Sequence, residues 1–194
     1  MANINVNNYS YQALCDQRAA LINERNAICL AFGEEFVPAD LDETLQKVLE
    51  EINKKEDLRN RKERLIRATY DIARDCGFVR IVDISDDDDF YLSGKINHAT
   101  EKKEHGVVFS VCPEVSVITV RVRSGESFER FFSLNTEEKK IFNMRSDIRT
   151  SISKFGVDNG LSNIDIAELY YMYNQIIDYL KSRGFEIEFP KFGM

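Results

Sequence analysis

The chain has 194 residues, 43% of them hydrophobic and 30% charged, and a formal net charge of −7. This composition is that of a globular protein able to bury a core, and no apolar run reaches the ~20 residues of a membrane helix. The net negative charge argues against a general nucleic-acid-binding protein, because the phosphate backbone is itself negative.

Residues 10–77 have the pattern of two long helices that form an antiparallel hairpin. The first helix carries two apolar rows side by side, Leu14, Leu21, Ile28 and Phe32 in one and Cys15, Ala19, Ile22 and Cys29 in the other. Ser10 is the expected cap of this helix and Gly33 its expected end. Asp40 is the expected cap of the second helix. The polar stretch 53–64 contains no Gly or Pro, so we expect the second helix to continue through it in contact with solvent.

After Gly77 the apolar period changes from 3.6 to two, which indicates strands. Five strands are expected, at residues 78–84, 90–96, 107–112, 115–122 and 127–134. The connections between them are short, which favours an antiparallel order. Gly125 can take the positive φ that a two-residue hairpin loop requires.

Two helices and a last strand complete the pattern. We expect one helix from a cap at Asn135 to an end at Gly156, and another that begins at a cap on Ser162. Residues 185–189 alternate as a final strand at an edge of the sheet. The predicted fold class is therefore α+β, with a long N-terminal antiparallel helical hairpin and an antiparallel five- or six-stranded sheet packed with two C-terminal helices.

The sequence divides most naturally at Gly77. Residues 1–77 form the predicted helical hairpin, which we interpret as a dimerisation arm of coiled-coil type. Residues 78–194 form the predicted α+β body.

Four consecutive aspartates, Asp86–Asp89, lie between two predicted strands. We favour a solvated turn, because Asp side chains bond nearby backbone N–H groups. A calcium loop of the EF-hand type that starts at Asp86 would need Gly and Glu where the sequence has Tyr91 and Asn97. A cation site or a catalytic carboxylate pair is the alternative interpretation.

Neither the histidines nor the cysteines form a recognisable catalytic or metal-binding set. His98 and His105 lie in one polar loop, and the cysteines are scattered without a CxxC pair, at Cys15, Cys29, Cys76 and Cys112. No nucleophile elbow, Walker loop or Rossmann glycine motif occurs. We therefore predict no catalytic residue, no metal and no cofactor. The first residues lack the features of a signal peptide, so we expect a cytoplasmic location and no membrane partner.

Two stretches are locally basic, residues 54–67 and 139–154. Strand alternation also places Arg121 and Arg123 on one face of their strand. A surface of such residues would attract a phosphate backbone. The candidates are Arg61, Arg64, Arg121, Arg123, Lys139, Lys140, Arg145 and Arg149. The interpretation we favour is that these residues lie on solvated helix and strand faces, where acidic loops balance their positive charge.

The tyrosines of the segment LYYMYNQ cannot all face one way on a helix. Tyr170 and Tyr173 fit the core, and Tyr171 is the candidate for contact with another protein.

The sequence favours a non-enzymatic protein–protein interaction or regulatory protein that forms a homodimer through its hairpin. Leu21 and Ile28 are the expected seam residues, since the second helix cannot cover both apolar rows of the first. Frequent residues with AT-rich codons fit a phage or mobile element of a low-GC bacterium, whose factors bind host proteins. A nucleic-acid-binding protein that uses the basic stretches is the alternative hypothesis. A metal-dependent enzyme built on the Asp86–Asp89 turn is the second alternative.

Overall fold

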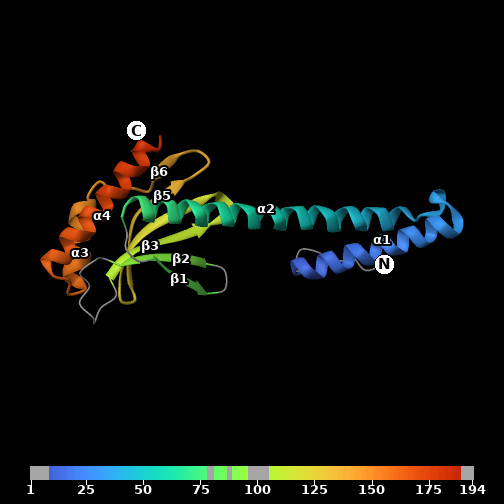
Figure 1. Cartoon of the computed structure of the whole chain (residues 1–194), viewed down its shortest axis with the longest axis horizontal. Coiled ribbons are helices and arrows are strands. Elements are labelled where there is room, and N and C mark those ends of the chain that lie inside the picture. The colour runs from blue at the N-terminus through green and yellow to red at the C-terminus, as the bar shows by residue number, and fades with distance from the viewer. Residues whose placement is uncertain (1–8, 78–80, 87–88, 96–104, 189–194) are drawn as a thin grey trace, which may run out of the picture. The chain divides into compact units, whose positions relative to one another are not determined.

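The computed structural model describes the backbone of residues 9–77, 81–86, 89–95 and 105–188, and the side chains of residues 9–77 and 106–188. Over this part of the chain the fold is α+β, with two long N-terminal helices, a mostly antiparallel sheet and two C-terminal helices, as predicted (Figure 1). The chain divides into two compact units, residues 1–60 and 61–194. The domain boundary expected at Gly77 stays a prediction, because compactness alone does not show which part folds independently.

The helices are α1 (Tyr11–Phe32), α2 (Ala39–Asp75), α3 (Ile148–Asp158) and α4 (Asn163–Ser182), with the short 3-10 turns η2 (Glu34–Phe36) and η3 (Pro113–Val115). The strands are β1 (Ile81–Asp86), β2 (Asp89–Lys95), β3 (His105–Cys112), β4 (Val117–Ser124), β5 (Ser127–Asn135), β6 (Lys140–Phe142) and β7 (Glu186–Ile187). Among the described residues, no helix combines the length and the apolar character that a membrane span requires.

The first unit contains α1, η2 and the first part of α2. The hydroxyl of Ser10 caps α1 by accepting from the Ala13 N–H at 3.2 Å, and Gly33 ends the helix with a φ of 103°. α2 begins at Ala39, so Asp40 lies in its first turn rather than at the predicted cap position. Because no Gly or Pro interrupts its polar middle, α2 runs unbroken for 37 residues, as predicted.

The hairpin has a small core. Leu14, Val48 and Ile52 are fully buried there, and Cys15 and Leu21 pack against them half-buried. Leu14 is the only residue of α1 that is buried in this part of the chain. The apolar face of α1 is therefore much wider than the surface that α2 covers.

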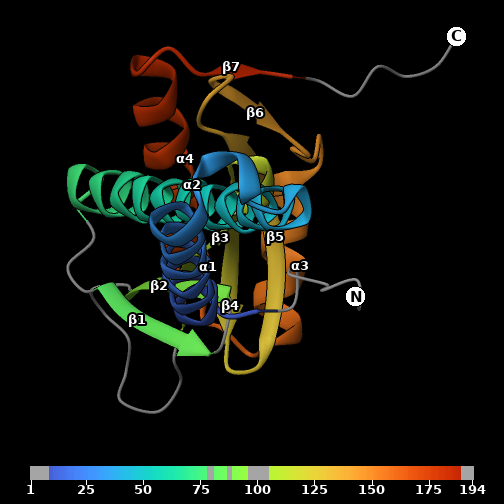
Figure 2. The ribbon, with the colours of Figure 1, turned by 90° about the vertical axis from the view of Figure 1, so that its right-hand side faces the viewer.

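The second unit is built on one sheet with the strand order β1-β2-β3-β4-β5-β6-β7. Every neighbouring pair is antiparallel except β6 and β7, which run parallel. Figure 2 shows β3, β4 and β5 side by side. β7 is the predicted final edge strand, and the N–H groups of Glu186 and Glu188 donate to the carbonyls of Lys139 and Ile141 at 2.8 and 2.7 Å.

One face of the sheet carries the main core. Alternate residues of β3 and β4 are buried on this face, namely Val107, Phe109, Val111, Ile118, Val120 and Val122. The end of α2, α3 and α4 add their apolar sides to the same cluster, including Leu65, Ile152 and Leu169. The helices of this unit therefore pack against a single sheet face.

A β-bulge interrupts the pairing of β4 with β5. Val120 lies opposite Phe132, but the next residue of β4, Arg121, lies opposite Arg130, so Phe131 has no partner in β4. Both phenylalanines are fully buried, and their rings meet Tyr173 of α4 edge-on at 5.4 and 6.0 Å. The bulge therefore places two consecutive large side chains in the core, which strict alternation forbids.

The helix predicted from Asn135 to Gly156 is wrong in its first half. The Asn135 side chain accepts from the N–H groups of Glu137 and Glu138 at 3.0 and 2.9 Å, which closes a turn instead of starting a helix. Lys139 then takes a left-handed φ of 51°, which no helix continues. β6 follows, pairs with β5 and buries Ile141 fully. The helix begins only at Ile148.

Gly156 lies inside α3 and does not end it, because α4 passes close to its backbone. A Cβ atom at this position would lie 2.4 Å from Cγ1 of the buried Ile166. Glycine is therefore required for close contact between the two C-terminal helices, not for a helix end.

We expect Gly156→Ala to lower the free energy of unfolding by about 1–3 kcal/mol, since the added methyl group overpacks a buried contact. Without this clash, Gly→Ala inside a helix would raise stability by up to about 1 kcal/mol. The sign of the change in the free energy of unfolding, measured by urea denaturation, therefore decides between these two effects. Ser153→Ala in the same helix is the control, and a stabilised Gly156→Ala protein would contradict the close approach.

Candidate interaction surfaces

The exposed apolar side chains of α1 and η2 form the first candidate surface. Ile22 is 38% exposed, Leu30 90%, Phe32 68% and Phe36 62%. Ala19 is exposed as well, and Cys15 and Cys29 are half-buried. We call the strip Cys15, Ala19, Ile22 and Cys29 the α1 strip; it is the second apolar row predicted from the sequence.

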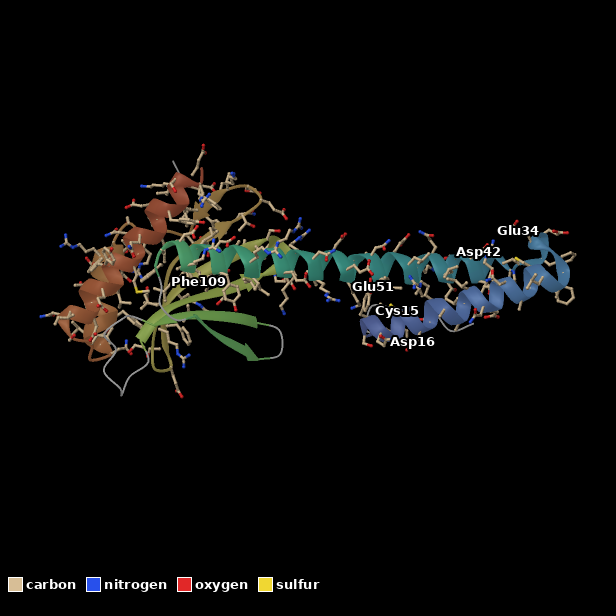
Figure 3. The ribbon with its side chains drawn as sticks, in the orientation of Figure 1. Cys15, Asp16, Glu34, Asp42, Glu51 and Phe109 are labelled. Atoms are coloured by element: carbon tan, nitrogen blue, oxygen red, sulfur yellow. The ribbon has the colours of Figure 1, made fainter. Side chains whose placement is uncertain are left out.

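Polar contacts hold the two ends of the hairpin. At the turn, the Arg25 guanidinium donates to Asp42 at 2.8 Å and to Glu34 at 3.0 Å. At the other end, the Tyr11 hydroxyl donates to Glu56 at 2.5 Å, and this bond is the main reason that the pKa of Tyr11 rises to about 12. Figure 3 shows Glu34 and Asp42 at the turn. These contacts fix how α1 lies on α2. Within the α1 strip, Cys15 packs against the hairpin core and the Cys29 sulfur accepts from Arg25 at 3.7 Å, while Ala19 and Ile22 are exposed.

The interaction residues predicted from sequence fall in different places. Leu21 is half-buried against the hairpin core, and Ile28 is also half-buried. Both belong to the row that lies toward α2, whereas Ile22 of the other row is more exposed. Tyr171 is 63% exposed on α4, as predicted, while Tyr173 is buried and Tyr170 half-buried.

The structure separates the predicted basic residues into several groups. Arg61 donates to the carbonyls of Pro113 and Glu114 at 3.2 and 3.1 Å, and therefore ties α2 to the η3 turn. Arg64 is exposed on α2. Lys139 donates to the Arg183 carbonyl at 3.4 Å, and Lys140 lies 3.5 Å from a carboxylate oxygen of Glu138. The Arg61 and Lys139 contacts link separate elements of the fold.

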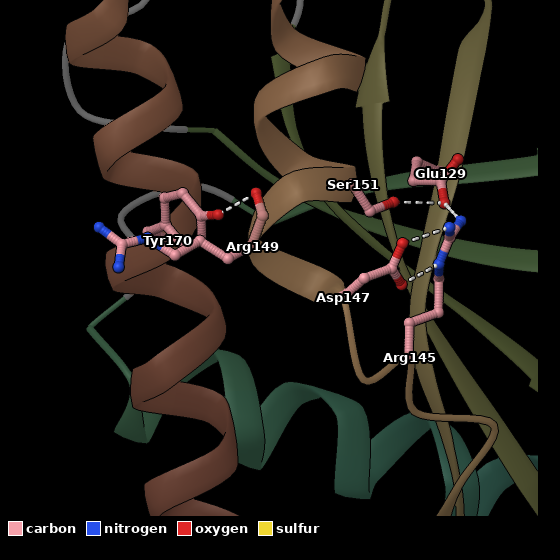
Figure 4. Close-up of polar contacts among 6 residues, drawn as sticks. All are labelled: Glu129, Arg145, Asp147, Arg149, Ser151 and Tyr170. Atoms are coloured by element: carbon pink, nitrogen blue, oxygen red, sulfur yellow. Dashed lines mark hydrogen bonds and ion pairs between the residues drawn. The ribbon is translucent and has the colours of Figure 1, made fainter.

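Arg145 and Arg149 lie on the helix side of the sheet. Arg145 donates to both carboxylate oxygens of Asp147 and to Glu129, each at 2.9 Å (Figure 4). Ser151 donates to the same Glu129 oxygen at 2.9 Å. The guanidinium of Arg149 lies 6.0 Å from the centre of the Tyr170 ring, whose hydroxyl donates to the Arg149 carbonyl.

The Arg145 network borders a cavity of about 340 Å³ between β5 and α3. Its lining mixes both signs of charge, with Glu129, Asp147 and Asp158 beside Arg145 and Lys154. Two carboxylates engage Arg145, so this arginine joins β5 to the start of α3. The arrangement therefore fits a structural link between β5 and α3 better than recognition of an anion.

Arg121 and Arg123 do share one face of β4, as predicted. The alternation in β4 buries Ile118, Val120 and Val122 and leaves the arginines half-buried on the other face. The guanidinium groups of Arg121 and Arg123 lie 5.1 and 5.7 Å from the centre of the Phe128 ring. Arg145 and Arg149 do not join them there.

Phe128 and Arg130 were missed by reasoning from the sequence. Simple alternation from Phe132 puts both on the core side of β5. The bulge at Phe131 moves them to the other face, opposite Arg123 and Arg121. The signal in the sequence was the pair of adjacent phenylalanines, since two such residues in a strand point to a bulge when both are buried.

The remaining predictions concern the acidic turn and the enzyme alternatives. β1 and β2 pair antiparallel with Asp86 opposite Asp89, while Asp87, Asp88 and His98 lie outside the described residues. His105 opens β3, and its side chain lies outside the described ones. Among the residues that the structure describes, no group of three His, Cys, Asp or Glu is placed to hold a metal ion.

The four cysteines are free thiols. Burial raises the pKa of the Cys76 thiol to about 11, which makes it a poor nucleophile. Partial desolvation and a hydrogen bond to Glu114 also raise the pKa of Cys112. Neither environment activates a thiol for covalent catalysis.

The sequence matches no family model, and comparisons with curated proteins and with solved structures give no significant match.

The Arg145–Asp147 pair predicts a pH effect. The hydrogen bonds from Arg145 lower the pKa of Asp147, so this carboxylate favours the folded state above the ordinary Asp pKa of about 3.9. That contribution is lost as the pH falls below this value. We expect Arg145→Gln to raise the pKa of Asp147 in a carboxyl NMR titration of the folded protein. Arg149→Gln is the matched control, and an unchanged titration in Arg145→Gln would refute the assignment.

Proposed function

We propose that this protein is a non-enzymatic interaction protein of the cytoplasm that forms a homodimer through the α1 strip. The observation that carries the proposal is the exposure of α1. Of its 22 residues only Leu14 is buried, and within the α1 strip Ile22 is 38% exposed and Ala19 is exposed as well. Free cysteines support a reducing compartment.

The small buried core of the hairpin favours a partner that covers its exposed apolar side chains. Three buried side chains contribute about 1.5–3 kcal/mol each. Ordering the backbone costs about 1–2 kcal/mol per residue, and a helix packed on so small a core depends on further burial. A partner that covers the exposed side of α1 supplies that burial.

A second copy of the chain fits this surface. α1 carries two bases, Arg18 and Arg25, and two acids, Asp16 and Glu24, so two α1 helices do not repel one another. At 1.5 Å per residue α1 is about 33 Å long, and with the adjoining side of α2 it offers a footprint of several hundred Å², near the ~800 Å² per partner of stable interfaces. Two-fold dimers are also the commonest oligomers.

The spacing of the α1 strip favours an antiparallel pairing. Cys15 and Cys29 lie seven residues before and after Ile22, so the two cysteines are placed symmetrically about Ile22. A two-fold axis at Ile22 would bring Cys15 against the partner's Cys29 on both sides. Small Cys and Ala side chains permit close approach of the helices.

The body supplies the second half of the proposal, which is contact with a different protein. Tyr171 supports it as a large aromatic side chain, 63% exposed on α4. Such a target fits a host factor of a phage or mobile element. Capture of a partner by the wild type and its loss in Tyr171→Ala would support this half, whereas equal capture by both proteins would refute Tyr171 as the contact.

We expect Ile22→Asp to convert the dimer to a 22.5 kDa monomer, because two buried isoleucines are lost from a symmetric seam. The dissociation constant should rise at least about a hundredfold. Light scattering at about 100 μM, well above a micromolar constant, measures the mass. Ala20→Asp places the same charge on the opposite side of α1 and should remain dimeric. A monomeric wild type at this concentration would refute the proposal.

Oxidation tests the antiparallel order. In a Cys112→Ser background, diamide should couple Cys15 to the partner's Cys29 and give a covalent dimer on a non-reducing gel. Replacing either Cys15 or Cys29 with Ser should abolish this dimer. A parallel pairing would join like residues, so crosslinking that survives both single replacements would overturn the antiparallel order.

A further inference from the structure

The outer face of the β4–β5 hairpin gathers one aromatic ring and three arginines. Arg121 and Arg123 of β4 lie opposite Arg130 and Phe128 of β5, so all four belong to the face turned away from the core. Phe128 is 44% exposed and Arg130 is exposed. We call these four residues the arginine–phenylalanine face.

The arginines of β4 on this face contact the phenylalanine ring of β5. The guanidinium groups of Arg121 and Arg123 approach the Phe128 ring within cation–π distance, at 5.1 and 5.7 Å from its centre. Arg121 also donates to the Ser110 hydroxyl, and Arg123 donates to the Gly125 carbonyl at 2.7 Å. The ring and its flanking charges are therefore held in a defined arrangement before any ligand arrives.

The charge distribution of β5 favours a ligand of negative charge. Arg130 lies directly opposite Arg121, and like charges across a strand pair are destabilising. Arg130 makes no ion pair with any residue of the described part of the chain, whereas the carboxylate of its neighbour Glu129 is turned to Arg145 and Ser151. The bulge therefore turns the carboxylate of Glu129 toward α3 and leaves the neighbouring Arg130 on the outer face beside Arg121.

We propose that the arginine–phenylalanine face binds single-stranded nucleic acid. An exposed ring flanked by arginines offers one base a stacking surface and offers the adjoining phosphates their counter-charge, the combination that sequence-tolerant single-strand binders use. A duplex hides its base faces, so it can use the charges but not the ring. This activity is independent of the dimerisation proposed above, because no residue of α1 takes part.

Fluorescence anisotropy of the full chain with a labelled oligothymidylate of about 15 nucleotides tests the proposal, at a salt concentration near 0.1 M. We expect binding that weakens roughly tenfold or more in Phe128→Ala, since one base loses its stacking partner. Phe128→Leu keeps an apolar side chain at the hairpin and should weaken binding similarly, which separates stacking from a loss of local structure. Tyr171→Ala removes an exposed aromatic residue elsewhere and should bind as the wild type does.

Salt dependence tests the arginines. Arg130→Gln should lower the slope of log affinity against log salt by about 0.7, the value for one phosphate contact on a single strand. Arg149→Gln removes the same charge from the helix side and should leave the slope unchanged.

Three results would overturn the proposal. One is the absence of binding by the folded wild type at low salt. Another is equal affinity of wild type and Phe128→Ala, which would reduce the interaction to general attraction of polyanions. The third is a preference for duplex of the same length, since a duplex cannot use the ring.

Discussion

The bulge at Phe131 determines the arrangement of most of the second unit. A strand that alternates strictly can place only one of two adjacent phenylalanines in the core. The extra residue in β5 allows Phe131 and Phe132 to meet Tyr173 together, and every residue before it in β5 changes face. Glu129 consequently reaches α3, and Arg130 reaches the outer face. The core, the cavity beside α3 and the arginine–phenylalanine face all depend on that single unpaired residue.

The two units differ in how they are stabilised. In the second unit a continuous apolar cluster joins the sheet to the end of α2 and to both C-terminal helices. In the first unit the cluster of Leu14, Val48 and Ile52 and a few polar bridges hold α1 on α2. Since apolar burial is the main favourable term in folding, the second unit is far better supported by its own contacts. The hairpin therefore gains most from association, and we propose its exposed side as the interface.

Much of the architecture follows from local patterns. The caps at Ser10 and Ser162, the long polar helix and the edge strand after Gly184 depend on near neighbours in sequence, and the structure contains them. Antiparallel order also follows, because the connections are too short for crossovers.

The failures have one physical cause, which is tertiary contact. Asn135 is a residue type favoured at helix caps. The chain instead forms β6, which pairs with β5 and buries Ile141 fully. Gly156 looks like a helix end, yet its role is set by Ile166 of another helix. The faces of Phe128 and Arg130 depend on a bulge that only packing of two rings against α4 selects. The basic residues offered as an alternative surface are likewise placed by tertiary contacts, since Arg61 donates to Pro113 and Arg145 to Glu129.

The short strand β7 also limits how the sheet can grow. Its neighbour β6 has three residues, and the carbonyl groups of Lys139 and Ile141 would face solvent if the chain ended after α4. An unpaired strand edge is a template for a strand from another molecule. β7 occupies this edge in parallel orientation, with Glu186 opposite Lys140 and Ile187 opposite Ile141. The β6 edge is thereby already paired, and a strand from another molecule could reach it only by displacing β7.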